Sequence, residues 1–402
     1  MTPRKKIFND PVYGFVSVPH GILLDLIDHP YFQRLRRIRQ LGLTSYVYPG
    51  ALHTRFHHAL GALHLMQQAI ETLGSKGTEI TAEEAEGACI AILLHDIGHG
   101  PFSHALEHIL ADMHHEDLSS LFMEDLNRQF GGQLDLAIRI FRNNYPKNFL
   151  HQLVTGQLDM DRLDYLNRDS FFTGVSEGVI SYDRIIKMLD VHEGELVVEE
   201  KGIYSIEKFL IARRLMYWQV YLHKTGVSAE KMLIHTLSRA RELFLEGEDL
   251  EMPRHLGWFF DWKPDDHTEP AELLAHFAGL DDHDVAAAIK YWSDASDFTL
   301  SFLSKGLLDR KLFRLEWHAA PINTDYVRGI QQKIAVILGE KAILDHLVYT
   351  GSESNRAYDD SKEQIKILFK NGAVLPIGQC SDVPLYTQLV TKHFICYPKV
   401  LP

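Results

Sequence analysis

Apolar residues recur at helical spacing through the first half of the chain, with polar positions between them. From Leu23 to Leu43 this period predicts a helix, and a break at Tyr48-Pro49-Gly50 separates it from a second helix expected from about His53 to Leu73. Arginines give the first helix a basic face, which is either a solvated surface, a phosphate contact or a subunit interface. The residues of this face are Arg34, Arg36, Arg37 and Arg39.

A stronger helix pattern follows. Thr81-Ala82-Glu83-Glu84 has the form of a capping box, and an apolar run leads from it to Leu94. We therefore predict a buried helix over residues 82–96, which the glycines and proline at 98–101 end. Ser103 is placed to cap another helix. Further helices are expected at residues 116–128, 134–142, 159–167 and 206–246.

The pattern changes between Glu246 and Pro270, where acidic residues, prolines and a run of aromatic residues interrupt the helical period. Beyond this boundary we expect a helical stretch at 271–305. Alternating β-branched and aromatic residues predict strands at 342–349, 364–369 and 386–397. The fold class is therefore mainly α, with a helical core over residues 1–250 and a smaller α+β module over residues 251–402 that packs on that core.

Composition narrows the class of protein. The 402 residues are 46% hydrophobic and 24% charged, which is typical of a soluble globular chain. The net charge of −13 disfavours nucleic acid as the main partner. The apolar run from Ala88 to Leu94 is too short to cross a bilayer, and no apolar segment follows the basic residues near the start, so we expect a cytoplasmic protein without a membrane partner.

Cysteine usage limits the kind of metal site. The three cysteines have no CxxC spacing, which argues against a thiolate zinc site, so any metal must use histidine and carboxylate ligands. The adjacent pair His95-Asp96 ends the apolar helix, where two buried polar groups need partners. His58 and Asp161 lie on two other predicted helices. Four such ligands suit Fe, Mn, Zn, Ni or Co and leave coordination positions open for water.

Two long motifs carry a family resemblance: LLHDIGHGPFSH at residues 93–104 and DMDRLDYLNRD at residues 159–169. With His58, they resemble the HD superfamily of phosphohydrolases, and specifically its branch of deoxynucleoside triphosphate triphosphohydrolases. The match extends from Asn9-Asp10-Pro11 to Lys224. It implies an α-helical HD-domain core with His58, His95, Asp96 and Asp161 as metal ligands, one divalent transition metal, and further Mg with the nucleotide.

The implied reaction is hydrolysis of a deoxynucleoside triphosphate to deoxynucleoside and triphosphate by metal-activated water. His99, His104, Glu107 and His115 match positions that face the phosphates or transfer protons. We expect His104 to be the general acid, with Glu107 tuning it and His115 as the alternate. Glu107 stands where relatives have Asp, which changes length but not charge.

The resemblance also implies a substrate-binding set. Arg55 and Arg162 are suited to hold phosphate oxygens, because a guanidinium binds them in a bidentate way. Family positions near the deoxyribose and base correspond to Gln40, Tyr165, Asp169, Arg213, Tyr217 and Tyr221. Tyr217 replaces a usual His and Leu222 a usual Gln, which leaves the base preference open. The family implies a nucleotide effector in some members and a homo-oligomer, either a dimer or a tetramer.

Other interpretations remain open at this point. The same chemistry suits a nucleotidase or phosphodiesterase acting on a nucleotide monophosphate or a cyclic nucleotide, and a nucleotide-sensing regulatory protein is a further class. The pattern His104-Ala105-Leu106-Glu107-His108 fits inverted zinc peptidases, but that interpretation leaves the other metal ligands unexplained. The neighbouring histidines are interpreted as surface or hydrogen-bonded structural residues: His53, His57, His108 and His114.

Overall fold

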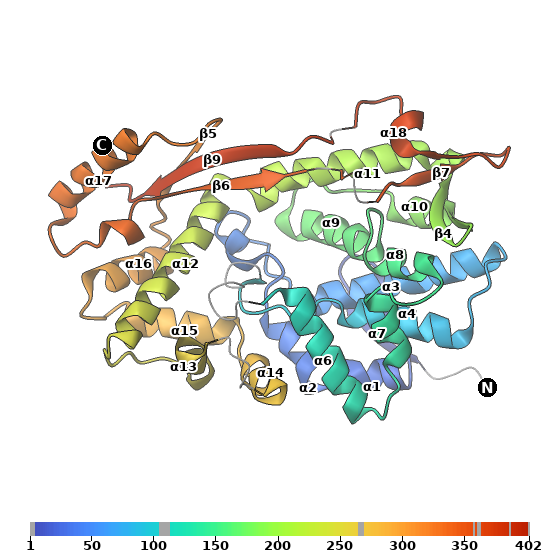
Figure 1. Cartoon of the computed structure of the whole chain (residues 1–402), viewed down its shortest axis with the longest axis horizontal. Coiled ribbons are helices and arrows are strands. Elements are labelled where there is room, and N and C mark those ends of the chain that lie inside the picture. Colours follow the sequence, from blue (N-terminus) through green and yellow to red (C-terminus); the bar gives the residue numbers. More distant parts are fainter. Residues whose placement is uncertain are drawn as a thin grey trace.

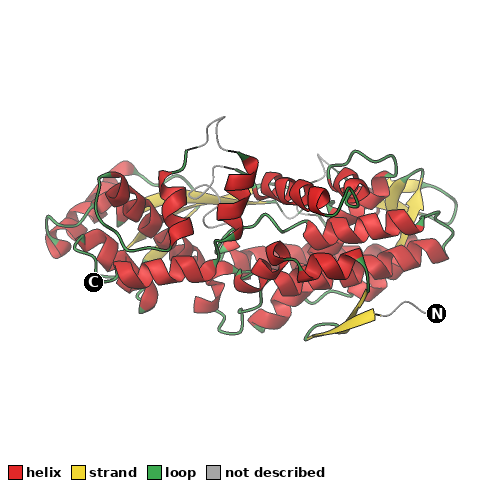
Figure 2. Ribbon diagram, turned by 90° about the horizontal axis from the view of Figure 1, so that it is seen from below, coloured by secondary structure: helices red, strands yellow, loops and turns green. Residues whose placement is uncertain are grey.

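The computed structural model describes residues 5–103, 113–263, 269–356, 358–359, 363–385 and 387–400. Helices make up most of an elongated molecule (Figure 1). Three strands run along one long edge: β5 (Arg314–His318), β6 (Tyr349–Asn355) and β9 (Val390–Tyr397). Helix α17 (Thr324–Leu338) lies at one end of the molecule, and strand β4 (Glu195–Glu199) lies near the other. Coloured by secondary structure, the ribbon is dominated by helices (Figure 2). The predicted mainly α fold with a smaller α+β region is confirmed.

The chain begins with an antiparallel hairpin of β1 (Lys5–Asp10) and β2 (Gly14–Pro19), followed by α1 (Ile22–Asp28), α2 (Pro30–Gln33) and a 3-10 helix (Arg34–Arg37). The single helix predicted over residues 23–43 is therefore wrong. His29 is extended because Pro30 disfavours a helical residue before it.

The arginines in this segment do not share one face. Arg34 is fully buried, and burial lowers its pKa to about 9. Arg37 binds the carboxylate of Asp281, and Arg36 lies over the ring of Phe56 at 3.5 Å. The single basic face predicted for Arg34, Arg36, Arg37 and Arg39 is therefore wrong, because Arg34 lies in the interior.

Three helices form the centre of the core: α3 (Arg55–Ser75), α4 (Ala82–Leu94) and α9 (Met160–Thr173), with α3 packed against the other two. The predicted capping box is confirmed, because the Thr81 hydroxyl accepts from Glu84 N at 3.1 Å and the Glu84 carboxylate from Thr81 N at 2.8 Å. The surrounding helices are α6 (His115–Gln129), α7 (Asp135–Phe141), α8 (Asn148–Val154) and α10 (Tyr182–Met188).

The helix predicted over residues 206–246 is broken in the middle. It consists of α11 (Ile203–Met216), a π-helical turn (Tyr217–Tyr221) and α12 (Lys224–Leu245). Hydrogen bonds in a π turn skip one residue more than in an α-helix, and such turns are frequent at functional sites. This one faces the cavity described below.

In the described residues between α12 and position 308, the chain forms the helices α13 (Arg254–Asp261), α14 (Pro270–Ala278), α15 (Asp282–Trp292) and α16 (Phe298–Leu308). The remaining elements are β5 (Arg314–His318), α17 (Thr324–Leu338), β6 (Tyr349–Asn355), β7 (Lys366–Leu368), β8 (Val374–Pro376), α18 (Ile377–Cys380) and β9 (Val390–Tyr397). The strand predicted at 364–369 is confirmed over Lys366–Leu368, and the strand predicted at 386–397 is confirmed over Val390–Tyr397. The strand predicted at 342–349 is wrong, since a 3-10 turn lies at Leu344–His346 and strand β6 begins only at Tyr349.

The strands form two further sheets. One has the order β5-β9-β6 and is antiparallel. The other has the order β3-β4-β7-β8, and its first two strands, β3 (Leu189–His192) and β4 (Glu195–Glu199), come from the first half of the chain. Because β4 pairs with β7 in parallel, the end of the chain returns to the first half.

Buried residues on both sides of position 250 belong to one continuous core cluster. Phe122 on α6, for example, lies 6.1 Å from Phe277 on α14, measured between ring centroids. The division of the chain into domains at residue 250 stays a prediction. No helix in the described ranges is both long and apolar enough to cross a bilayer.

Candidate metal centre and adjoining cavity

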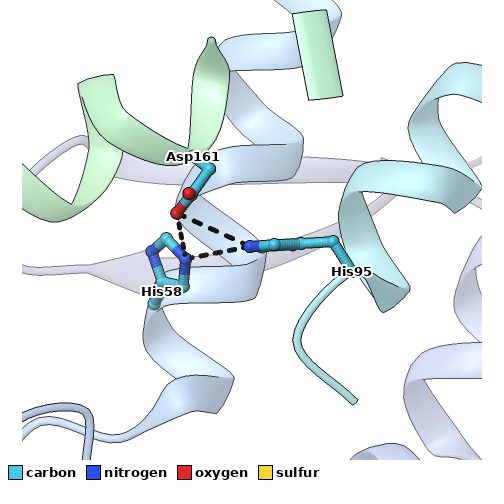
Figure 3. Close-up of side chains that lie close together, drawn as sticks. All are labelled: His58, His95 and Asp161. Atoms are coloured by element: carbon cyan, nitrogen blue, oxygen red, sulfur yellow. Dashed lines mark hydrogen bonds and ion pairs between the residues drawn. The ribbon is translucent and has the colours of Figure 1, made fainter. Parts of the chain in front are cut away.

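Three predicted metal ligands from three helices meet at one point. Nε2 of His58 on α3 lies 3.4 Å from Nε2 of His95 at the end of α4. Oδ1 of Asp161 on α9 lies 3.1 Å from the His58 nitrogen and 3.5 Å from the His95 nitrogen. All three side chains point toward one another (Figure 3). Asp96 is close by, with Oδ2 3.6 Å from His58 Nε2 and Oδ1 3.4 Å from His95 Nε2.

Hydrogen bonds on the far side of each imidazole fix its orientation. Nδ1 of His58 donates to Asp164 Oδ2 at 2.8 Å, and Nδ1 of His95 donates to the carbonyl of Ile92 at 2.6 Å. Carboxylate and carbonyl oxygens only accept, so in each neutral imidazole the proton is on Nδ1 and the lone pair is on Nε2. Two such lone pairs and the Asp161 carboxylate, aimed at a common point, fit a divalent cation.

The electrostatics of the group agree with this assignment. Burial acts to lower the pKa of His58, but the carboxylates of Asp161 and Asp164 outweigh it and raise that pKa to about 10. Burial would raise the pKa of Asp161, yet His58 and His95 hold it well below its usual range. The site therefore favours positive charge, either protons or a metal ion. Two imidazoles and two carboxylates do not determine which metal is bound.

Asp164 belongs to a buried chain of charges that the sequence analysis missed. Its carboxylate accepts from Arg168 Nε at 2.9 Å, and Arg168 Nη1 donates to Asp10 Oδ2 at 2.8 Å. Gly61 on α3 leaves room for this pair, since a Cβ there would overlap both Asp164 and Arg168. The spacing offered a signal, because Asp161 and Asp164 are three residues apart on one helix and so share a face.

Arg55 has two partners within the protein. Its Nη1 binds the Asp96 carboxylate, and its Nε donates to Ser103 Oγ at 2.9 Å. We expected Arg55 to hold phosphate oxygens, and it does line the cavity described next. Its contact with Asp96 also lets it orient a predicted metal ligand, which the sequence analysis did not foresee.

A cavity of about 420 Å³ adjoins the metal ligands, a volume within the range of small-molecule sites. Most of the predicted site residues line it: Gln40, Arg55, His95, Asp96, His99, His115, Asp161, Arg162, Tyr165, Asp169, Tyr217 and Tyr221. His58 is fully buried behind His95 and Asp161.

One predicted site residue lies outside the cavity wall. Arg213 is not among the residues that line this cavity, and its Nη1 donates to Gln157 Oε1 at 3.2 Å. His104 and Glu107 lie outside the described residues. His115 stacks on His99 with 4.1 Å between ring centroids, and His99 Nε2 is 3.3 Å from Asp96 Oδ1. The roles assigned to all of these residues stay predictions.

Tyrosines and one aspartate form another part of the cavity wall. The Tyr221 hydroxyl donates to Asp169 Oδ2 at 2.8 Å, and His53 Nε2 lies 2.7 Å from Asp169 Oδ1. The π turn brings Tyr217 and Tyr221 to the same wall, with 5.2 Å between their ring centroids. His53 is 1% exposed, as expected for a hydrogen-bonded structural histidine. Because its partner Asp169 lines the cavity, His53 also helps to hold the cavity wall in place.

Two polar side chains in the wall retain unused hydrogen-bonding capacity. Gln40 Oε1 is buried and has no hydrogen-bond partner among the described residues. Arg162 binds the Asp159 carboxylate through Nη1, while its buried Nε has no partner within the described ranges. Both residues line the cavity, while these two atoms are themselves buried.

Comparison with known proteins gives consistent results. The HD domain family matches residues 55–169, and the HD associated region matches residues 180–255. The uncharacterised protein YwfO of Bacillus subtilis is 30% identical over 99% of this chain and 93% of its own length. A crystal structure of a phosphohydrolase from Bacteroides thetaiotaomicron has 50% identity and a TM-score of 0.95, over 98% of this chain and 100% of that one.

A further relative is named for an activity. The deoxynucleoside triphosphate triphosphohydrolase SAMHD1 homologue of Dictyostelium discoideum is 33% identical over 62% of this chain. The match spans 52% of that relative's length.

Proposed function

Because this chain belongs to the HD superfamily of metal-dependent phosphohydrolases, we propose that it hydrolyses deoxynucleoside triphosphates to deoxynucleoside and inorganic triphosphate. One observation carries the proposal. A single cavity is lined both by the metal-binding residues His95, Asp96 and Asp161 and by the Tyr221–Asp169 pair. The relative from Dictyostelium supports the choice of substrate.

The metal-binding end accounts for the phosphoryl chemistry. A divalent cation there lowers the pKa of water and neutralises charge on phosphate oxygens. Arg162, held by Asp159, presents its guanidinium to the cavity and is suited to bind a phosphate. Asp159 and Arg162 stay together on ligand binding, because burial would otherwise leave each charge without a partner.

The reaction breaks the bond between the α-phosphorus and the 5′ oxygen, and the oxygen of water joins the α-phosphorus. The 5′ oxygen leaves with a proton, which we assign to His104 with His115 as the alternate donor. His115 lines the cavity and stacks on His99, which itself lies beside Asp96.

The wall formed by Tyr165, Tyr221 and Asp169 is suited to the sugar. Rings of Tyr165 and Tyr221 lie 6.2 Å apart and present flat apolar surface beside polar atoms. Gln40 lines the same cavity, and its side-chain amide is suited to form a hydrogen bond with a sugar hydroxyl. A deoxyribose lacks the 2′-hydroxyl and therefore needs less room beside this wall than a ribose does. For this reason we expect the site to prefer deoxynucleotides.

The experiment is a product analysis. Purified protein is incubated with each dNTP and each NTP in the presence of Mn²⁺ or Mg²⁺, and the products are separated by chromatography. We expect deoxynucleoside and triphosphate in equal amounts, and in ¹⁸O-water the label in the triphosphate. Pyrophosphate or orthophosphate would contradict the proposal, and hydrolysis of monophosphates or cyclic nucleotides alone would assign the site to a nucleotidase or phosphodiesterase.

Two controls define the assay. An Asp161→Ala variant should bind nucleotide but lose turnover, because it lacks a metal ligand and keeps the cavity wall. If wild type and variant bind nucleotide and neither turns it over, the sensor interpretation is favoured. Light scattering measures whether the protein forms the homo-oligomer that we expect from the family. Repeating the measurement with dNTP tests whether a nucleotide effector changes the oligomeric state.

A further inference from the structure

Phe102 and Ser103 form a strained part of the cavity wall. Their φ angles are 53° and 59°, in the left-handed region that residues with a side chain rarely adopt. Both residues line the cavity. Strain of this kind persists only where the surrounding structure holds it, and it clusters at functional sites. Some other group must therefore hold these two peptides in place.

That group is Asp282, the first residue of α15. Its Oδ1 accepts from Phe102 N at 2.7 Å, and its Oδ2 accepts from Arg39 N at 3.0 Å. The side chain is buried, with the residue 6% exposed. One carboxylate from the second half of the chain thus joins two segments of the cavity wall, one beside Gln40 and the other at Ser103.

The contacts continue from this wall to the metal centre. Ser103 Oγ donates to the carbonyl of Arg39 at 2.8 Å and accepts from Arg55 Nε at 2.9 Å. Arg55 in turn binds the carboxylate of Asp96. An unbroken series of hydrogen bonds therefore leads from Asp282 to a metal ligand.

Arg34 makes a second connection between the same two regions. Its Nη2 donates to the carbonyl of Ile97, the residue after Asp96, at 2.7 Å. Its Nη1 donates to the carbonyl of Leu280 at 3.3 Å, two residues before Asp282. The position of the loop at the start of α15 is thus coupled to the metal-ligating loop at two points.

We propose that Asp282 is a positioning residue of the hydrolytic site, which holds the wall at Phe102–Ser103 and, through Arg55, the metal ligand Asp96. It contacts no reacting group and acts through backbone N–H groups. The proposal goes beyond the proposed function, because it holds for any substrate that this HD site hydrolyses. On this proposal, the start of α15 helps to determine the geometry of the catalytic site.

The test compares Asp282→Asn with a matched control, Asp297→Asn. Asp297 also caps a helix in this region, accepting from Leu300 N at 2.7 Å, and pairs with Arg239 at 3.0 Å, but it does not line the cavity. An asparagine at 282 keeps one acceptor and turns an NH₂ group toward the other N–H. We expect kcat to fall about 10- to 100-fold for Asp282→Asn, since small misplacements have effects of this size. KM should change less, and one metal per chain should still bind.

Asp297→Asn should lose thermal stability yet keep kcat within about twofold of wild type. Substrates are the dNTPs and a chromogenic phosphodiester, so a failure of the dNTP assignment leaves the test intact. Hydrogen exchange provides a readout without any substrate: the peptide covering residues 97–103 should exchange faster in Asp282→Asn and not in Asp297→Asn. Unchanged kcat and exchange in Asp282→Asn, or equal losses in both variants, would overturn the proposal.

Discussion

Asp164 accepts a hydrogen bond from Nδ1 of His58 at 2.8 Å, and this contact determines which nitrogen of His58 faces the other metal ligands. The carboxylate is itself held by Arg168, which reaches Asp10 at the end of β1. Orientation of a metal-binding imidazole thus depends on a fully buried ion pair, with Asp164 and Arg168 both 0% exposed. Such outer contacts commonly affect metal affinity nearly as much as the ligands do.

Gly61→Ala should abolish this arrangement without removing any charged group. The added Cβ would overlap the Asp164 carboxylate and the Arg168 guanidinium, so both must move and His58 loses its hydrogen-bond partner. We expect metal affinity to fall about 10- to 100-fold in a calorimetric titration with Mn²⁺. Gly74→Ala is the control, because nothing lies within 4 Å of a Cβ there on the same helix. Equal metal affinities for both variants would contradict the prediction.

Asp164→Ala should reduce stability as well as metal affinity. It leaves Arg168 buried with Asp10 as its remaining carboxylate partner, and breaking a buried ion pair typically costs about 3–5 kcal/mol. Urea unfolding of the metal-free protein measures this loss separately from metal binding. A free energy of unfolding within about 1 kcal/mol of wild type would show that Asp10 alone satisfies Arg168.

Metal binding should stabilise the wild-type protein and not the Asp161→Ala variant. A ligand at 100 times its Kd stabilises the folded state by about 2.7 kcal/mol, provided that the unfolded state does not bind it. Thermal unfolding with increasing Mn²⁺, and again after chelator treatment, measures the gain. Asp294→Ala serves as the control, since the Asp294 side chain is 88% exposed and Asp294 does not belong to the group of converging ligands. Equal stabilisation of Asp161→Ala and wild type would show that the metal binds elsewhere.

Two tyrosines of the cavity should differ in their effect on stability. Tyr221→Phe removes the donor to Asp169 Oδ2 and leaves that buried oxygen without it, at a cost of about 1–3 kcal/mol. No hydrogen bond of the Tyr165 hydroxyl occurs among the described residues, so Tyr165→Phe should change stability by less than about 0.5 kcal/mol. Both variants should discriminate less between dNTP and NTP in kcat/KM. If both variants discriminated between dNTP and NTP as strongly as wild type, neither hydroxyl would contribute to substrate selection.

The sequence predicted the core helices from local pattern, and the three helices that it assigned to His58, His95 and Asp161 do bring these side chains together. The apolar run before His95 and the capping box at Thr81 define α4 without any tertiary information. The helix expected over residues 23–43 failed at Pro30, whose effect on the residue before it outweighed the apolar period. In the segment Tyr217–Tyr221 there is neither glycine nor proline, so nothing local predicted the π turn.

Asp282 could not have been found from pattern at all. It lies 180 residues from Phe102 and 243 from Arg39, and an aspartate near a helix start is normally interpreted as a cap. Asp281 fills that capping role, accepting from His283 N at 2.8 Å. Only the three-dimensional arrangement reveals that the next carboxylate turns the other way, toward the cavity.

The contacts of Asp282 also have a consequence for protein synthesis. Domains tend to fold as the chain leaves the ribosome, N-terminal parts first, and contacts between distant residues form late. The helices that hold His58, His95 and Asp161 are complete long before α15 is translated. We expect a nascent chain to acquire its metal ligands early and its finished cavity wall late, so that hydrolytic competence arises only after the second half has docked.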